Sequence, residues 1–355
     1  MGNQNGAQRS ARSSREIGGR NMSTAATSDG ARTIALQVRR FIDEEVIPQE
    51  HRHDTLGHGV SDELRADLQA KAQAAGLFAP TGPSQLGGLG LNHGEQARVL
   101  EEAGRSLLGP VALNCAAPDE GNILLLHRVA TASQRARYLA PLVAGRIRSC
   151  FAMTEPAPGA GADPDSLLTT ARRAGDNWLI NGTKWFTTGA DGASFAIVMA
   201  RTGPAATMFL VDSDNPGMKV ERLLGTMDSA FAGGHAEMSF TDCLVPGDAV
   251  LGEVDQGFRY AQVRLGPARL THCMRWLGAA RRAHEEAVRY AASRTMFGTV
   301  QAELGMTQAM IADNEIDIAT SRAIIRTAAA VLDAGQSARR ETSIAKTFVS
   351  EAVNR

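Results

Sequence analysis

Two short stretches decide the fold of this chain: CFAMTEP at Cys150–Pro156 and NGTKWFTTG at Asn181–Gly189. Together they place three aromatic rings beside three threonine hydroxyls, which are Phe151, Trp185, Phe186, Thr154, Thr187 and Thr188. Aromatic faces can cover a flat, electron-poor ring such as a flavin. Hydroxyl and backbone donors can hydrogen-bond the carbonyl and nitrogen edges of that ring, which gain charge on reduction. The pair of stretches therefore indicates a flavin site.

Together and in this order, the two stretches resemble the flavin-contacting strands of the acyl-CoA dehydrogenase family, whose patterns read TEP and K-x-W-x-T. The resemblance implies an FAD cofactor. It also implies that Thr154 bonds the pyrimidine end of the flavin, that Phe186 covers one ring face and that Thr188 bonds near N5. We expect the ring to be lined by Phe151, Met153, Thr154, Glu155, Phe186, Thr187 and Thr188. From residue types alone, without the paired stretches, a place in the core of a β-domain would be favoured for Trp185 and Phe186.

The composition of the 355 residues narrows the class of protein. Hydrophobic residues make up 43% of the chain, and the net charge of −1 gives no reason to expect nucleic acid as a partner. No apolar run reaches the length of a membrane span. We expect a soluble protein, cytoplasmic in a bacterium and mitochondrial or peroxisomal in a eukaryote. Four cysteines without a C-x-x-C pair are expected to be reduced and buried: Cys115, Cys150, Cys243 and Cys273.

Changes in pattern divide the chain into four parts and predict an α+β fold. Residues 1–30 are polar and expected to be disordered; they faintly resemble an organelle transit peptide, and an upstream start codon explains them equally well. Residues 31–148 show helical spacing and predict an N-terminal helical domain. Residues 149–254 predict a middle β-domain, and residues 255–355 predict a C-terminal helical bundle.

Turn residues and apolar runs add detail to these parts. The dipeptide Asn181-Gly182 is expected to form a tight turn, and strands are expected at 195–200, 208–212 and 236–240. Long helices are expected at 258–294, at 305–334 and from 337 onward. The glycine-rich loop Pro80–Leu91 joins helices and is therefore interpreted as a connection, not as a dinucleotide fingerprint.

The order of helices, strands and helices also resembles the acyl-CoA dehydrogenase architecture from about Ala31 onward. The segments NCAAPDEGNILLLH (Asn114–His127) and RLGPARLTHCMR (Arg264–Arg275) resemble the branch that includes the human members ten and eleven. This resemblance places Arg269 near the substrate and the catalytic base, with His272 beside it one helical turn later. Residue type alone would put both on a solvated helix face.

Two further positions follow from the resemblance. Ala162 stands where the family often has a serine that touches substrate phosphate or flavin, so one donor is missing. Arg294, Phe297 and Gly298 match an Arg-x-x-Phe-Gly motif that reaches the FAD pyrophosphate and adenosine of a neighbouring subunit. We therefore expect a homodimer or homotetramer whose FAD lies at an interface. Gly305 occupies a position that usually holds glutamine.

The activity implied is α,β-dehydrogenation of an acyl-CoA thioester. A carboxylate base removes the α-proton while a hydride leaves the β-carbon for flavin N5, and electrons pass to an electron-transferring flavoprotein. Neither family position for the base carries a carboxylate: one is Ala268, and the other is expected beyond Arg355, past the segment matching Ser343–Lys346. We therefore expect no catalytic residue within the chain, an incomplete bundle and an inactive 355-residue chain.

Two alternative functions stay open. One is a flavin oxidase or monooxygenase on the same scaffold. The other is a non-catalytic or damaged paralogue that acts as a binding or assembly subunit.

Two other sets of polar residues are interpreted as solvated parts of helices. Glu50 and His53, near His58, have a spacing found in di-iron bundles, but a second such pair is missing, so a solvated helix end is favoured and no metal is expected. The basic pairs Arg281-Arg282 and Arg339-Arg340 are interpreted as solvated faces of the bundle.

Overall fold

The computed structural model of this protein describes residues 18–52, 59–161, 163–226 and 232–355. Of the extension expected to be disordered, residues 1–17 lie outside the described residues, and helix α1 begins at Gly18. His53, His58 and Ala162 also lie outside them. Within the described ranges, none of the helices is both long and apolar enough to cross a lipid bilayer.

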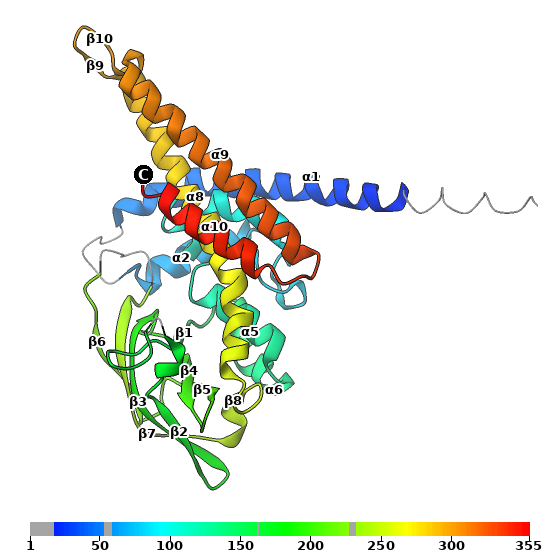
Figure 1. Cartoon of the computed structure of the whole chain (residues 1–355). Helices are drawn as coiled ribbons and strands as arrows, with labels where there is room; N and C mark the ends of the chain where they lie inside the picture. Colours follow the sequence, from blue (N-terminus) through cyan, green and yellow to red (C-terminus); the bar gives the residue numbers. More distant parts are fainter. Residues whose placement is uncertain (1–17, 53–58, 162, 227–231) are drawn as a thin grey trace, which may run out of the picture.

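Helices make up the first part of the described chain (Figure 1). They are α1 (Gly18–Phe41), η1 (Ile42–Val46), η2 (Ile47–Arg52), α2 (Asp62–Ala74), η3 (Ser84–Leu86), α3 (His93–Ala103), α4 (Gly109–Ala112), α5 (Asp119–Val129), α6 (Ala132–Gln134), η4 (Arg135–Leu139) and α7 (Ala140–Val143). Side-chain caps fix several starts, because free N–H groups at a helix N-terminus need acceptors. Ser61 accepts from the Leu64 N–H at α2, and Asn92 forms a capping box with Glu95 at α3. The loop at 80–91 joins α2 to α3, as predicted.

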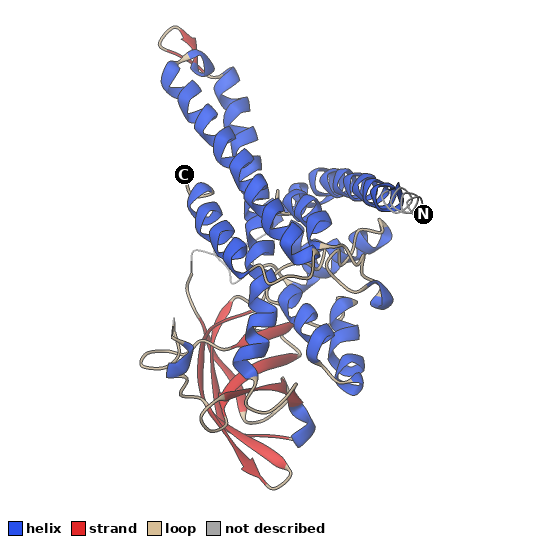
Figure 2. Ribbon diagram, turned by 45° about the vertical axis from the view of Figure 1, so that its right-hand side comes forward, coloured by secondary structure: helices blue, strands red, loops and turns tan. Residues whose placement is uncertain are grey.

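The middle of the chain forms one mixed, eight-stranded sheet (Figure 2). Its strands are β1 (Ser149–Ala152), β2 (Thr170–Ala174), β3 (Asn177–Thr188), β4 (Phe195–Arg201), β5 (Ala206–Asp212), β6 (Met218–Leu223), β7 (His235–Val245) and β8 (Val250–Leu251), with short helices η5 (Pro164–Ser166) and η6 (Gly247–Ala249). The strands lie in the order β6-β7-β3-β2-β4-β5-β8, and β1 pairs in parallel with β4. The strands expected at 195–200, 208–212 and 236–240 are confirmed.

The tight turn predicted at Asn181-Gly182 is wrong, because β3 runs through both residues. The pairing of β3 with β7 shifts register between Ile180 and Gly182, which marks a bulge. Gly182 has a φ of +152°, and a Cβ there would collide with Thr169. The Asn181 side chain accepts from the Asp242 N–H at 2.8 Å. Asn181 and Gly182 thus form a bulge within a long strand instead of a hairpin turn.

Long helices return after the sheet and confirm those predicted. They are α8 (Gly257–Ser293), α9 (Gly305–Asp333) and α10 (Arg339–Ala352), with β9 (Thr295–Met296), β10 (Thr299–Val300) and η7 (Gln301–Glu303) between the first two. Figure 1 shows α8 and α9 side by side as an arm with the β9–β10 hairpin at its tip, while α10 packs against both. At about 1.5 Å per residue, α8 is about 55 Å long, so it reaches from the sheet to the hairpin.

Two hydrophobic clusters define the layers of the molecule. One cluster joins the helices to one face of the sheet and includes Leu125 of α5, Leu270 of α8 and Ile197 of β4. The other lies on the opposite face and includes Trp178 and Phe209. The helices therefore cover one face of the sheet, which confirms the α+β class, and leave a seam between α5, α8 and β1.

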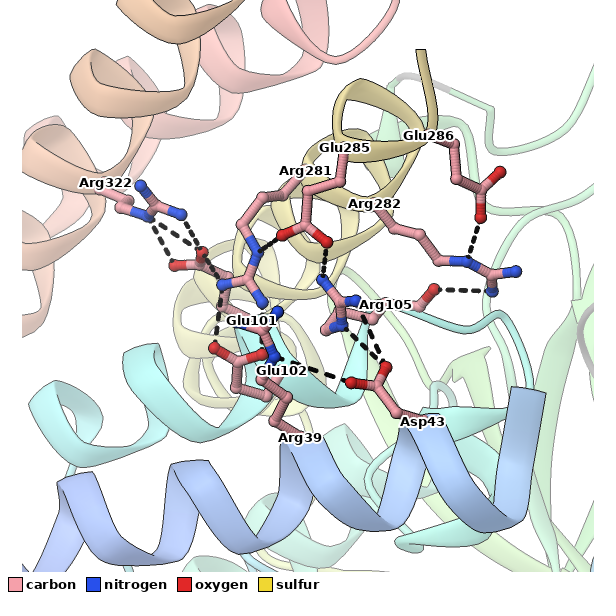
Figure 3. Close-up of polar contacts among 10 residues, drawn as sticks. All are labelled: Arg39, Asp43, Glu101, Glu102, Arg105, Arg281, Arg282, Glu285, Glu286 and Arg322. Atoms are coloured by element: carbon pink, nitrogen blue, oxygen red, sulfur yellow. Dashed lines mark hydrogen bonds and ion pairs between the residues drawn. The ribbon is translucent and has the colours of Figure 1, made fainter. Parts of the chain in front are cut away.

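Charged residues tie the helices together in an ion-pair network (Figure 3). Arg281 of α8 donates to Glu101 of α3 at 2.7 Å and also to Glu102. Burial opposes the charge on Arg281, but its bonds to these carboxylates outweigh burial and raise its pKa. The prediction of a solvated Arg281-Arg282 pair is therefore wrong, because the acidic face of α3 packs against it. Arg339 and Arg340 are exposed, as predicted.

Glu50 at the end of η2 belongs to the same system of contacts. Its carboxylate accepts from Arg282 at 2.6 Å and from the Ser106 hydroxyl at 2.7 Å. The solvated helix end predicted at Glu50 is wrong for this residue, because α8 approaches it from elsewhere in the sequence. Among the residues that the structure describes, no group of three or more histidine, cysteine or acidic side chains is arranged to hold a metal.

Candidate functional site

The first predicted stretch lies at the seam between the sheet and the helices. Successive side chains of a strand point to opposite faces. Cys150 and Ala152 of β1 accordingly pack into the cluster of the sheet, whereas Phe151 and Met153 pack against the cluster that contains the helices. Phe151 and Met153 are half-buried. This side of β1 is therefore shared between the sheet and the helices.

A buried ion pair holds the turn that follows β1. Glu155 accepts from the N–H groups of Leu168 at 2.6 Å and Thr169 at 2.8 Å, and from Lys184 Nζ at 2.9 Å. Lys184 also donates to the Met153 carbonyl oxygen at 3.1 Å, and its side chain is 0% exposed. Burial raises the pKa of Glu155, but Lys184 and the hydrogen-bond donors outweigh it and lower the pKa to about 2. Burial lowers the pKa of Lys184 to about 8. The Glu155 carboxylate thus anchors the turn.

The second predicted stretch presents a stacked aromatic pair. The rings of Trp185 and Phe186 lie 5.0 Å apart between centroids, with 14° between their planes. Phe186 has a φ of +50°, a backbone conformation that few non-glycine residues adopt, and the residue is 52% exposed. Uncommon backbone conformations of this kind cluster at ligand-binding sites. The pair therefore offers a flat apolar face to a ligand.

Hydrogen bonds bring the two predicted stretches side by side. The Thr154 carbonyl oxygen accepts from the Trp185 N–H at 2.8 Å. Thr188 Oγ1 lies 3.0 Å from His235 Nδ1 of β7. The Thr187 hydroxyl and the Trp185 indole N–H are buried and have no hydrogen-bond partner among the described residues. Hydroxyl groups and an exposed ring thus gather on this part of β3.

The predicted substrate residues lie on α8. Arg269 and His272 are one turn apart and half-buried, and the Arg269 guanidinium forms no ion pair with any residue that the structure describes. His272 lines a mostly apolar pocket together with Trp276, and its other side borders a second pocket that includes Lys346 of α10.

Two carboxylates, the buried Glu120 and the half-buried Asp119, lie between α5, β1 and α8. Glu120 accepts from the Thr271 hydroxyl at 2.9 Å and lies 3.5 Å from Arg275 Nη1. Asp119 accepts from the Ser149 N–H at 2.8 Å and from the Ser149 hydroxyl at 2.6 Å. Burial raises the pKa of Asp119. Both carboxylates therefore have partners within the protein.

Arg294 and Phe297 are far from this seam. Arg294 directly follows α8, and Phe297 lies between β9 and β10, 91% exposed and with a φ of +52°. Figures 1 and 2 show this hairpin at the tip of the arm, away from the sheet. Arg264 contacts Phe151, and Arg294 lies about 45 Å further along α8 at 1.5 Å per residue. The structure separates Arg294 and Phe297 from the other predicted cofactor residues of the same chain.

Comparisons with known proteins agree with this architecture. Three domains of one family match the chain: "Acyl-CoA dehydrogenase, N-terminal domain" at residues 28–146, "middle domain" at 150–243 and "C-terminal domain" at 255–355. The chain is 41% identical over 276 residues to "Probable acyl-CoA dehydrogenase FadE2" of Mycobacterium tuberculosis, covering 75% of this chain and 67% of that protein. It therefore belongs to the acyl-CoA dehydrogenase family.

Further relatives refine this placement. The chain is 38% identical over 336 residues to acyl-CoA dehydrogenase family member 10 of Mus musculus, covering 89% of this chain but only 31% of the mouse protein. The predicted resemblance to the branch of members ten and eleven is thus confirmed. A Mycobacterium abscessus structure described as an acyl-CoA dehydrogenase has a TM-score of 0.84 at 38% identity, covering 91% of this chain and 85% of that one. A glutaryl-CoA dehydrogenase from Mycobacterium smegmatis in complex with FADH2 shares the fold, with a TM-score of 0.81 at 23% identity and coverage of 91% and 81%.

The chemistry of the gathered groups fits a flavin. The Phe186 ring supplies an exposed flat face, and threonine hydroxyls lie near it on β3. Sequence reasoning missed Lys184, which anchors the turn, and Arg264, which contacts Phe151. Neither role could be predicted from the sequence. Lysine and arginine are usually solvated, and a single buried lysine or arginine leaves no periodic signal.

Proposed function

We propose that this chain binds FAD and removes hydrogen from the α and β carbons of an acyl-CoA thioester. The observation that carries the proposal is the Trp185–Phe186 stack with its exposed Phe186 ring, beside a turn that the Glu155–Lys184 pair holds in place. Membership of the acyl-CoA dehydrogenase family supports the same reaction class.

Each residue has a separate task in this proposal. Bound FAD supplies the acceptor for the hydride that leaves the β-carbon. Phe186 covers one ring face and keeps water from it, while Thr154 and Thr188 donate hydrogen bonds to the polar edge. Glu155 and Lys184 keep the Thr154 backbone against β3, so the donors and the aromatic face stay in register.

The substrate side of the proposal rests on α8. Arg269 and His272 can donate hydrogen bonds to phosphate or thioester oxygens of an acyl-CoA, and His272 lines two pockets beside α8. No residue is assigned as the acceptor of the α-proton. Ala268 carries no carboxylate, and Glu120 is already hydrogen-bonded to Thr271.

The proposal extends to assembly and to electron transfer. We propose a homo-oligomer in which Arg294 and Phe297 contact the FAD of a neighbouring subunit. Their exposure at the tip of the arm supports this assignment. Electrons then pass to an electron-transferring flavoprotein.

FAD titration of the purified 355-residue chain tests the flavin site. We expect tight binding with quenched flavin fluorescence, since aromatic rings lie at the site. Thr188→Val removes one hydrogen bond to a buried group, which costs about 1–3 kcal/mol, so the Kd for FAD should rise by roughly fivefold to 150-fold. Thr327→Val, at an exposed position on α9, is the matched control and should leave the Kd unchanged.

Acyl-CoA addition then tests the chemistry. Bleaching of bound flavin by a saturated acyl-CoA under anaerobic conditions would support dehydrogenation and would contradict the expectation that the 355-residue chain is inactive. A colourless preparation that gains no flavin when FAD is added would overturn the proposal and favour a binding or assembly subunit.

A further inference from the structure

Arg264 is a buried arginine that no acidic side chain contacts directly. Its Nε donates to Asn122 Oδ1 at 2.7 Å, and its Nη2 donates to the Pro118 carbonyl oxygen at 3.3 Å. Among the described residues it forms no ion pair. Burial lowers the pKa of Arg264 to about 10, which still leaves it charged near neutral pH. Because burying an unpaired charge is costly, such a residue requires an explanation.

The guanidinium occupies a slot between β1 and α5. Its carbon lies 4.2 Å from the centroid of the Phe151 ring. On the α5 side lies Gly121, where an added Cβ would come within 3.2 Å of the same carbon. A planar cation therefore stacks on the aromatic ring, and two hydrogen bonds fix its orientation.

The carboxylates nearest to this charge are occupied elsewhere. Asp119 and Glu120 act on Arg264 through space, but Asp119 accepts from Ser149, and Glu120 accepts from Thr271 and lies near Arg275. Arg281, on the same helix, differs because Glu101 and Glu102 pair with it directly. Arg264 is thus a buried cation beside the TEP stretch that lacks a direct counter-ion.

We propose that Arg264 fixes the Phe151 ring and supplies a positive charge that favours the reduced state of the flavin. This inference rests on the proposed function, because it requires FAD beside Phe151. Reduction adds negative charge to the flavin, and a cation held nearby in a dry environment stabilises that charge. Arg264 is a positioning residue in this account, because it acts through Phe151 and through its field.

The test is the midpoint potential of the FAD-loaded 355-residue chain. Arg264→Gln removes the charge, and we expect the equilibrium constant for two-electron reduction to fall at least tenfold, which lowers the potential by about 30 mV. Arg264→Lys keeps a charge and should stay within about threefold of the unmodified chain. Arg259→Gln removes an exposed charge from the same helix and should change nothing.

A second variant neutralises Arg264 without removing it. Asn122→Asp places a carboxylate where Nε already donates, so an ion pair forms. The potential should again fall, even if Arg264→Gln does not fold. Unfolding by urea, measured in parallel, separates a role in stability from a role in the potential.

The outcomes distinguish this inference from the proposed function. An unmodified chain that takes up no FAD overturns both. A loaded Arg264→Gln or Asn122→Asp variant with an unchanged potential overturns the inference alone. So does an Arg264→Lys shift as large as that of Arg264→Gln, because the charge would then not be the cause.

Discussion

At the scale of single residues, the Glu155–Lys184 pair is the sharpest feature of the site. Two charges stay buried because each has several partners: the carboxylate accepts from backbone N–H groups as well as from Lys184. Removing one partner leaves the other charge buried and unpaired, which typically costs about 3–5 kcal/mol. We expect Glu155→Gln to lower the free energy of unfolding at pH 7 by about this amount, measured by urea denaturation. Glu237→Gln, in an ion pair at the sheet surface, should cost less than about 1 kcal/mol.

The same pair predicts a dependence of stability on pH. The pKa of Glu155 is lowered to about 2 in the folded chain, below its ordinary value of 4.5. The unfolded chain therefore binds a proton first as the pH falls, so the contribution of Glu155 is complete above pH 4.5 and is lost between 4.5 and about 2. The free energy of unfolding should fall more steeply across this window in the unmodified chain than in Glu155→Gln. Equal slopes would contradict the assigned charge on Glu155.

The residues of the site differ in how well the sequence predicts them. Phe186 and the threonines stand out in the sequence, because aromatic and hydroxyl residues next to each other indicate a site for a flat ring with polar edges. Lys184 lies in the same stretch, yet its role depends on Glu155 and Met153, which approach it only in the folded chain. A local pattern cannot supply that information.

At the scale of elements, α3 connects the N-terminal helices to the arm formed by α8 and α9. Glu101 of α3 accepts from Arg281 of α8 and from Arg322 of α9, and its side chain is largely buried. Glu101→Gln should lower the free energy of unfolding by about 2–3 kcal/mol, because Glu102 still partners Arg281. Glu286→Gln removes an exposed i,i+4 pair and should cost about 0.5 kcal/mol at most. Urea denaturation measures both, and equal losses would contradict the role of α3.

Helices with a strong hydrophobic periodicity could be predicted from the sequence. The bulge and the ion pairs, which depend on residues far away in the sequence, could not. Apolar spacing identified α8 and α9 because helical periodicity persists over many turns. Asn181-Gly182 looked like a turn because a bulge uses the same residue types, and only the approach of Thr169 decides between them. Arg281 and Arg282 looked solvated because their acidic partners come from α3 and η2.

At the scale of the whole molecule, the order of helices, sheet and helices was readable from changes in hydrophobic period. The seam between them was not, because Phe151 and Arg264 meet only after α8 packs against β1. The length of the arm formed by α8 and α9 decides which residues can meet within one chain. Arg294 lies about 45 Å along α8 from Arg264, so it cannot reach the proposed flavin site of its own chain.

This geometry predicts that Arg294 acts in a neighbouring subunit. Arg294→Ala should raise the Kd for FAD by about tenfold or more, because a charge-assisted bond to phosphate is lost. Arg326→Ala, exposed on α9, serves as the control. Mixing Arg294→Ala chains with Phe186→Ala chains should restore one good site in each mixed pair, since one subunit keeps its ring and its neighbour supplies an intact arm. If Arg294 acted within its own chain, mixing would restore nothing. A monomer saturated with flavin in sedimentation would also contradict the prediction.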